Sequence, residues 1–389
     1  MDGLNKSMFQ IGSDTAFAVL SRSNELSQLG NEVINLGIGQ PDFNTPQNIV
    51  EAGIKALKDG HHGYSASNGI LELRESVCEY YSNQGINLDP GQVLITPGAK
   101  AVIFYTLLMF GQPDAEIIVP NPGFIAYKSM VDYTGAKIIS LPHQMQNNFS
   151  FDAEELLSLI TPKTRLIIFN SPGNPTGGVV RENEFKKLVK GLENYPNLYI
   201  LSDEIYERII FNNQKHISLL SYPEIKDQVI LLNGWSKTYS MTGWRLGYGI
   251  YPKKIFPFAE KLAINCHSCV SNVSQYAGIE ALRGSQLFVT NMVKEFEDRK
   301  NFLVEELNKI KNIECIDPGG AFYVFPKITK KGLSSKQISN DLLEKKFLAT
   351  VPGSSFGTLG EGFIRLSYAN KMHNLKKSIL LIKDYLNEN

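Results

Sequence analysis

Short runs of apolar, β-branched residues recur along the first two thirds of the chain, and helical patterns or turn signals lie between many of them. Such runs are typical of buried strands in a mostly parallel sheet. Seven of them are present, at 93–96, 116–120, 137–141, 165–170, 198–203, 229–233 and 246–250. Amphipathic helical patterns fit between several of them, at 100–110, 152–160 and 182–192. The alternation predicts an α/β layer fold.

The pattern changes after about residue 280. A long, charged helical stretch at 289–311 is followed by a strand-like segment at 319–326, and a helix at 335–345, a strand at 363–369 and a last helix complete the chain. This order suits a smaller α+β domain. The first 46 residues lack a strand pattern that matches the large sheet. The predicted division is therefore an N-terminal arm and part of the small domain at 1–46, a large domain at 47–285 and a small C-terminal domain at 286–389.

Charge and hydropathy narrow the class of protein. Lys plus Arg and Asp plus Glu both total 39 among 389 residues, so the formal net charge is zero. This balance gives no electrostatic footprint for nucleic acid or an anionic membrane, and favours a small-molecule substrate. No apolar stretch is long enough to span a bilayer, and the N-terminal segment lacks the apolar core of a signal peptide. The expected location is the cytoplasm.

The four cysteines do not form a disulfide framework in a chain of this size. Cys266 and Cys269 have the spacing of half a zinc site or of a redox pair. A second Cys or His pair at metal spacing is missing, so the sequence favours ordinary thiols in a reducing compartment and predicts no metal site.

Lys237 is the first candidate for chemistry. It follows the apolar run at 229–233 and lies among glycines and the aromatic residues Trp235, Tyr239 and Trp244. Burial among aromatic groups lowers the pKa of a lysine and makes its amine a nucleophile. Arg245 in the same Gly-rich segment is suited to binding a phosphate through its planar guanidinium group.

Other candidate residues also follow predicted strands, where α/β proteins place ligand sites. Asp203 ends one apolar strand, where a carboxylate is costly unless it is paired, and Tyr206 lies three residues later. A protonated heterocyclic nitrogen would suit Asp203, although a helix N-cap is an equally good interpretation. Asn174 is the one side chain with both donor and acceptor in the rigid loop at 170–178. The small residues from Gly98 leave N–H groups free for a phosphate at a helix N-terminus.

Together these segments resemble the class I/II aminotransferases, which are pyridoxal-phosphate (PLP) enzymes of fold type I. The resemblance covers nearly the whole chain. The motifs that carry it are LGIGQPDFNTP (36–46), HGYSASNGILELRESV (62–77), SPGNPTGG (171–178), SDEIY (202–206), SKTYSMTGWRLGY (236–248) and RLSYA (365–369). It implies a large domain with a mostly parallel seven-stranded sheet between helices, and a smaller α+β domain.

The resemblance implies roles around the cofactor ring. Lys237 is the lysine that binds PLP as a Schiff base and later moves the substrate proton. Asp203 pairs with the pyridinium nitrogen, which keeps the ring an electron sink. Tyr206 and Asn174 hydrogen-bond the phenolic oxygen of the ring, and Phe124 stacks on it.

The resemblance also implies a phosphate site. Arg245 and the Ser236 hydroxyl bind the phosphate together with the backbone N–H groups of Gly98, Ala99 and Lys100.

The resemblance further implies a substrate site and a contact with the partner subunit. It implies that Arg365 binds the substrate α-carboxylate, with the Gly39 backbone and Asn174 in the same subsite. Tyr64 matches a tyrosine that reaches the phosphate of the neighbouring subunit's PLP, so a homodimer is implied.

The nearest resemblance is to the bacterial aspartate-aminotransferase-like subgroup. There a Ser-x-Thr near the N-terminus and a lysine bind the side-chain carboxylate, and Ser13, Thr15 and Lys100 stand at the matching places. A dicarboxylic partner such as aspartate, glutamate or 2-oxoglutarate is favoured. Phe124 stands where that subgroup usually carries tryptophan, so an alanine or aromatic amino-acid transaminase remains an alternative.

Three other functions remain as rivals. A C–S lyase on the same fold would share Lys237, Asp203 and Arg365, and would release pyruvate and ammonia without an oxo-acid acceptor. A PLP-sensing regulator would need a DNA-binding domain before the first motif. A PLP-independent Schiff-base enzyme such as an aldolase would leave Asp203, Tyr206 and Arg245 without a purpose.

Overall fold

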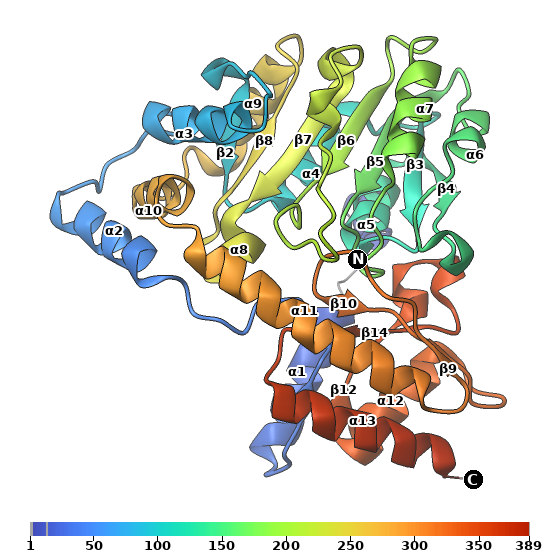
Figure 1. Ribbon diagram of the computed structural model, residues 1–389. Helices are drawn as coiled ribbons and strands as arrows, with labels where there is room; N and C mark the ends of the chain where they lie inside the picture. The colour runs from blue at the N-terminus through green and yellow to red at the C-terminus, as the bar shows by residue number, and fades with distance from the viewer. Residues whose placement is uncertain (1–2, 13–14, 389) are drawn as a thin grey trace.

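The computed structural model describes residues 3–12 and 15–388, and its centre is a seven-stranded sheet (Figure 1). The strands lie in the order β2-β8-β7-β6-β5-β3-β4, and only β8 runs antiparallel to its two neighbours. Their bounds are β2 Val93–Thr96, β3 Glu116–Asn121, β4 Lys137–Pro142, β5 Thr164–Asn170, β6 Tyr199–Asp203, β7 Val229–Gly234 and β8 Gly247–Ile250. All seven predicted strands are present with ends within one residue, and the predicted α/β fold of type I is confirmed.

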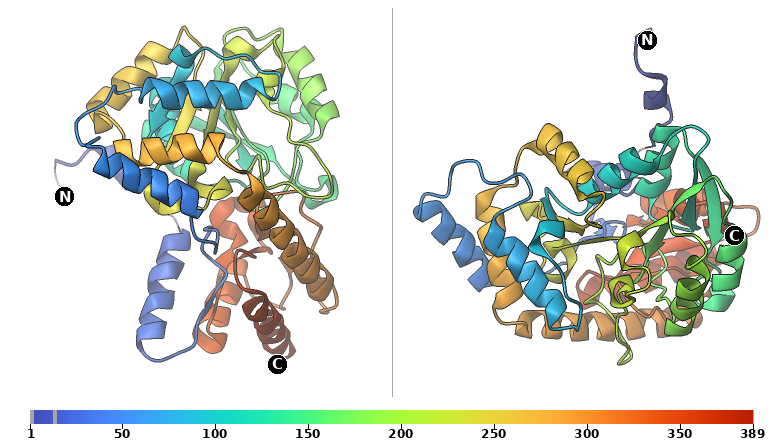
Figure 2. Two further views of the ribbon diagram at one scale, coloured as in Figure 1. Left: turned by 60° about the vertical axis from the view of Figure 1, so that its left-hand side comes forward. Right: turned by 90° about the horizontal axis from the view of Figure 1, so that it is seen from above.

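Alternate residues of each central strand enter two separate hydrophobic cores, because successive side chains point to opposite faces of a sheet. In β5, Leu166 and Ile168 belong to one core, whereas Ile167 and Phe169 belong to the other. Helices α4, α5 and α9 cover the first face, and α3, α6, α7 and α10 cover the second. Helices α2, α3 and α10 lie together on that second side (Figure 2). Burial on both faces explains why the strands are continuous apolar runs.

These helices have the bounds α2 Gln47–Lys58, α3 Leu71–Ser82, α4 Lys100–Phe110, α5 Ile125–Thr134, α6 Ala153–Ser158, α7 Glu182–Leu192, α9 Phe256–His267 and α10 Asn272–Arg283. The predicted helices at 100–110 and 182–192 have the observed ends, and α6 is shorter than predicted at both ends.

The chain after α10 forms the lower part of the molecule in Figure 1. Its helices are α11 Leu287–Asn308, α12 Ser335–Lys346 and α13 Met372–Asn387, and its strands are β9 Ile313–Glu314, β10 Tyr323–Val324, β11 Lys327–Ile328, β12 Leu348–Ala349, β13 Val351–Pro352 and β14 Ile364–Ser367. The prediction of one long strand at 319–326 is wrong. Gly320 forms an isolated bridge with Ile210, and Ala321 has a left-handed φ of 60°, so only two residues remain to pair with β14.

The N-terminal segment lies with these C-terminal elements. Strand β1 (Ile34–Asn35) pairs in parallel with β12, and helix α1 (Thr15–Gln28) packs against β12 and β13. No helix in the described part of the chain has both the length and the apolar character needed to cross a membrane.

Candidate active site

The predicted site residues meet at one edge of the sheet. Strands β5, β6 and β7 are parallel neighbours, so their carboxyl ends lie side by side. Asn174 follows β5, Asp203 ends β6, and Lys237 lies in the short helix α8 (Trp235–Thr238) directly after β7. Arg365 reaches the same place from β14, in the lower part of the molecule (Figure 1).

Lys237 carries a partly buried amine. Its Nζ donates a hydrogen bond to the carbonyl oxygen of Gly39, at 2.6 Å. Burial, together with the nearby guanidinium groups of Arg365 and Arg245, lowers the pKa of Lys237 to about 8. About a tenth of this amine is therefore neutral at pH 7, far more than for a lysine with the usual pKa, and a nucleophile or general base must be in this neutral form.

The aromatic environment of Lys237 differs from the prediction. The polar groups of the three expected aromatic residues have other partners: Trp235 donates to Gly278, Tyr239 to Gln286 and Trp244 to Thr45. The ring that lies beside the amine is Phe322, with its centroid 5.9 Å from Nζ. The pKa of Lys237 is lowered, as the sequence predicts, and the causes are burial and the neighbouring cations.

Asp203 is a buried carboxylate, with 4% of its surface exposed. Burial raises the pKa of Asp203 to about 6, against the hydrogen bonds that favour its charged form. These come from the Tyr127 hydroxyl at 2.5 Å and the Ile205 N–H at 3.2 Å. No ion pair to Asp203 is formed within the described residues. A cationic ring nitrogen beside it would supply the missing charge, which a pyridinium group does.

Two further polar groups lie beside Asp203 and Lys237. Tyr206, which is fully buried, shares a hydrogen bond of 2.9 Å with the hydroxyl of Tyr323. The buried Asn174 accepts a hydrogen bond through Oδ1 from Arg365 Nη1, at 2.9 Å. The amide of Asn174 therefore still offers its two N–H donors, as binding of a phenolic oxygen requires.

The structure provides a cradle for a phosphate. Gly98 has a left-handed φ of 90°, and a Cβ added there would lie 2.2 Å from Arg245 Nη2, so only glycine allows the guanidinium group to lie this close. Ala99 and Lys100 form the N-terminus of α4, whose first N–H groups have no partner within the helix. Ser236 lies in α8, next to Lys237. Arg245 is exposed and donates through Nη1 to Thr242, which leaves Nη2 available.

Arg365 is a buried cation held by neutral groups. Its Nη2 donates to the Gly37 carbonyl at 2.5 Å, and its Nε has no hydrogen-bond partner. The guanidinium carbon lies 4.6 Å from the Tyr323 ring centroid and 5.0 Å from that of Phe356. A buried arginine with an unpaired donor and no carboxylate partner within the described residues fits an anionic ligand.

The residues predicted to bind a side-chain carboxylate are only partly described. Lys100 Nζ lies 5.3 Å from the ring centroid of Phe124 and 6.0 Å from that of Phe17. Thr15 is the first residue of α1. Ser13 lies outside the described residues.

Tyr64 lies in the loop between α2 and α3. Its side chain is 92% exposed. The loop that carries it is fixed by α10, because Asn272 donates to the Gly63 carbonyl and Gln275 to Ser65. A large aromatic side chain on an anchored loop in solvent suits contact with another molecule.

Three residues in this region were not identified from the sequence: Tyr127, Phe322 and Tyr323. Tyr127 follows Phe124 by three residues on α5, so helical spacing could have placed both on one face. Phe322 directly precedes β10, and Tyr323 lies in it. Their contacts with Lys237 and Tyr206 span more than 80 positions of the chain, and no local pattern indicates such contacts.

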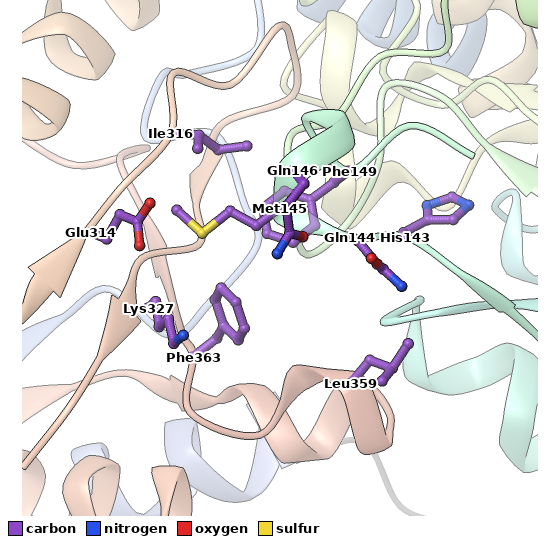
Figure 3. A pocket seen from close by; sticks show the side chains of 10 residues that line it. All are labelled: His143, Gln144, Met145, Gln146, Phe149, Glu314, Ile316, Lys327, Leu359 and Phe363. Carbon is purple, nitrogen blue, oxygen red and sulfur yellow. The ribbon is translucent and has the colours of Figure 1, made fainter. Parts of the chain in front are cut away.

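The cavity in Figure 3 is separate from this site. It has a volume of about 330 Å³ and lies between the loop after β4 and strands β9 and β11. Met145, Phe149, Ile316 and Phe363 form its apolar walls, and none of its lining residues is a predicted site residue.

One group of side chains in the described residues has metal-ligand geometry: Glu204, Glu207 and His216, with ligand atoms within 4.8 Å of one another. These groups already bond within the protein. His216 Nε2 lies 2.8 Å from a Glu204 oxygen, and Glu207 accepts from Tyr80 and Asn233. Cys266 and Cys269 are not part of this group, and both are free thiols.

Comparison with known proteins agrees with this geometry. Residues 31–379 match the family model described as aminotransferase class I and II. The chain is 40% identical to an aspartate aminotransferase of Pyrococcus horikoshii over 361 residues, which is 91% of both chains. It is 37% identical to aromatic-amino-acid aminotransferase 2 of Thermococcus litoralis, over 94% of both chains. The crystal structure of the aspartate aminotransferase of Rhizobium meliloti superposes with a TM-score of 0.94 at 29% identity, covering 100% of this chain and 99% of the other.

Proposed function

This chain belongs to the class I and II aminotransferase family, and we propose that Lys237 is its catalytic lysine and that its substrates are dicarboxylic. Members of this family use pyridoxal phosphate, and the protein is a transaminase that moves an amino group between amino acids and 2-oxo acids. The observation that carries the proposal is the Lys237 amine, with its pKa lowered to about 8, beside the buried groups Asp203 and Arg365.

The residues present fit the cofactor. Asp203 lacks a cation that a pyridinium nitrogen supplies, and Gly98 lets the Arg245 guanidinium group lie against the residues that begin α4, where a phosphate would bind. We assign Asp203 to the ring nitrogen, Tyr206 and Asn174 to the phenolic oxygen and Phe124 to the ring face. The phosphate is assigned to Arg245, the Ser236 hydroxyl and the N–H groups of Gly98, Ala99 and Lys100. When bound, PLP supplies an electron sink for the charge that develops at the substrate Cα.

The side chains of this protein divide the remaining work. Arg365 binds the substrate α-carboxylate through its guanidinium group, and Asn174 and the Gly39 backbone hold the substrate in the same subsite. Lys237, once free as a neutral amine, removes the proton from the substrate Cα as a general base. Its contact with the Gly39 carbonyl places the amine next to the loop that borders the substrate.

Replacing Arg365 with alanine is expected to raise the KM for the amino acid about 10- to 100-fold, because a charge-assisted bidentate contact is lost. The visible absorbance of bound PLP should be retained, since Arg365 holds the substrate rather than the cofactor. Steady-state kinetics and the absorbance spectrum of the same preparation test this. A KM equal to that of the wild type would exclude Arg365 from the substrate site.

The proposed preference for dicarboxylic substrates depends on Lys100, whose cation lies over the Phe124 ring. Ser13 and Thr15 are proposed to assist it. Replacing Lys100 with methionine keeps the length of the side chain and removes the charge. We expect kcat/KM for aspartate to fall about 10- to 100-fold, with little change for alanine. An equal decrease in kcat/KM for aspartate and alanine would show that Lys100 does not bind the side-chain carboxylate.

We propose that the enzyme is a homodimer in which Tyr64 reaches the cofactor phosphate of the partner subunit. The 92% exposure of this anchored tyrosine supports the proposal, as do the exposed apolar residues Phe104 and Leu108 on α4. Light scattering after size-exclusion chromatography should give twice the mass of the chain, 43.4 kDa. Mixed dimers of Lys237→Ala and Tyr64→Ala chains should regain activity, because one site in each dimer then has both residues.

We also propose that the chain divides into domains at 1–46, 47–285 and 286–389. The pairing of β1 with β12 supports grouping the N-terminal segment with the small domain.

A cytoplasmic location is also proposed. The four free thiols support it, since such thiols suit a reducing compartment. Cell fractionation tests the location.

The test of the function as a whole is the visible spectrum of the purified protein. Aspartate, glutamate, alanine and phenylalanine are added separately, without an oxo-acid acceptor. We expect a yellow cofactor band that converts fastest to the pyridoxamine form with aspartate or glutamate. Fastest conversion with phenylalanine would replace the dicarboxylic assignment with an aromatic one. If none of the four converts the band and added cysteine, which has a sulfur leaving group on Cβ, releases pyruvate and ammonia, the protein is a lyase. No band after reconstitution with PLP would refute the assignment of Lys237.

A further inference from the structure

Tyr323 lies where the cofactor-binding and substrate-binding residues meet. It comes from β10, which pairs antiparallel with β14, the strand that carries Arg365. Its side chain is 1% exposed. The phenol ring lies against the Arg365 guanidinium group, at 4.6 Å from its carbon to the ring centroid. The hydroxyl lies 2.9 Å from the hydroxyl of Tyr206, which comes from the loop after β6 in the central sheet.

The same hydroxyl also touches the loop that contacts Lys237. A Cβ added to Gly39 would lie 2.1 Å from the Tyr323 hydroxyl oxygen, so only glycine allows this approach. The carbonyl of Gly39 accepts the hydrogen bond from Lys237 Nζ. Tyr323 therefore contacts Tyr206, which is proposed to bind the cofactor oxygen, and Arg365, which is proposed to bind the substrate carboxylate. It also contacts Gly39, in the loop that accepts the hydrogen bond from Lys237.

We propose that Tyr323 is a positioning residue that directs the hydroxyl proton of Tyr206 toward the cofactor and holds the Arg365 guanidinium group in place. The inference rests on the proposed function, because it needs Tyr206 at the phenolic oxygen of PLP. It goes beyond that function by assigning a role to a residue that touches neither substrate nor cofactor in the scheme above.

The reason lies in the number of protons available. Each phenol has one O–H donor, and either hydroxyl of the Tyr206–Tyr323 pair can donate to the other. If Tyr206 donates to the cofactor oxygen, Tyr323 must be the donor to Tyr206. A hydroxyl that accepts a hydrogen bond becomes a stronger donor, because the two bonds polarise each other. Tyr323 thus strengthens the bond that Tyr206 makes to the cofactor and fixes its direction.

The first test replaces Tyr323 with phenylalanine, which removes only the hydroxyl and keeps the ring on Arg365. Weaker donation by Tyr206 leaves more negative charge on the cofactor oxygen, and this charge holds the proton on the lysine-linked nitrogen more tightly. We expect the pKa of the bound chromophore, measured by visible titration without substrate, to rise by about half a pH unit. The KM for the amino acid should change less than about twofold, since the contact with Arg365 remains.

A double-mutant cycle separates this role from a general structural one. Tyr206→Phe alone should raise the chromophore pKa more than Tyr323→Phe, and the double variant should match Tyr206→Phe alone. Tyr323→Leu, which also removes the ring, should raise the KM several-fold in addition. Tyr385→Phe serves as the control, because it removes a hydroxyl in α13 that donates to Asp341 in α12 and should leave the chromophore pKa unchanged.

An unchanged pKa in Tyr323→Phe, or additive shifts in the double variant, would overturn the inference while the proposed function stands. If the wild-type protein binds no PLP, the proposed function fails and the inference fails with it.

Discussion

Replacing Lys237 with alanine is expected to lower kcat/KM for transamination by about 10⁴-fold or more. Two contributions are lost together: the amine that binds the cofactor covalently and the general base that takes the Cα proton. The structure makes this lysine unusual, since burial and the Arg365 and Arg245 cations lower its pKa to about 8. The direct measurement is reduction with borohydride followed by peptide mass spectrometry. The cofactor mass should remain on the peptide that contains Lys237 in the wild type and be absent in the variant.

Lys300 provides a matched control for the loss of a buried lysine. Its side chain has 0% exposure, and it pairs at 2.7 Å with Asp317, which is not among the proposed site residues. Lys300→Met is expected to lower the melting temperature and to keep the reducible cofactor link. If Lys237→Ala retains that link, or retains more than about one per cent of the activity, Lys237 is not the nucleophile.

The strands of the central sheet were the most predictable part of the fold. Strands buried on both faces are continuous apolar runs, and in β2, β6 and β7 these runs end at Gly, Pro or polar residues that mark the strand ends. Helix α3 could also have been predicted from its hydrophobic periodicity, although it was not identified. Its buried positions Leu73, Val77 and Tyr81 repeat every four residues among charged ones.

The short strands of the lower part were harder to predict, because they depend on contacts from distant segments. The segment 319–326 has strand-like composition, yet Gly320 bridges to Ile210 and the chain turns at Ala321. Strand β1 has two residues and exists only through its pairing with β12. Composition carries no record of such pairings, since they are decided by the packing of the whole chain.

The candidate site also contains both residues that could be predicted from the sequence and residues that could not. Lys237, Asp203 and Asn174 follow strands that run in parallel, so their approach to one another follows from the fold. Tyr127 reaches Asp203 across 76 positions, and its hydroxyl opposes the effect of burial on the pKa of that carboxyl. Such a partner is recognisable only once α5 and β6 are placed in space.

Replacing Asp203 with asparagine is expected to have opposite effects on activity and on the stability of the cofactor-free protein. The activity should fall by roughly 10³-fold, because a buried cationic ring nitrogen loses its counter-charge. Asparagine fits the site sterically. Its oxygen can accept from the Ile205 N–H, and its NH₂ group can donate to the Tyr127 hydroxyl, which then acts as an acceptor.

The stability of the cofactor-free protein should depend on pH in a defined direction. Burial raises the pKa of Asp203 from 3.8 to about 6, so the folded state binds this proton more tightly than the unfolded state. The wild type therefore loses stability as the pH rises from about 4 to about 6, by roughly 3 kcal/mol in all for a shift of about two pH units. Asp203→Asn carries no charge and escapes this loss.

Melting temperatures of the cofactor-free proteins at pH 5 and pH 8 test this account. Asp203→Asn should melt roughly 2–5 °C above the wild type at pH 8 and about half as far above it at pH 5, because about half of the loss has occurred between the unfolded pKa of 3.8 and pH 5. Asp89 is the control of opposite sign, since its hydrogen bonds with Lys253 and the Gly91 N–H hold the pKa of its carboxyl below the usual value. Asp89→Asn should not stabilise the protein at pH 8. If Asp203→Asn is less stable than the wild type at both pH values, the carboxylate is not a buried charge awaiting a cation, and its assignment to the ring nitrogen loses its physical basis.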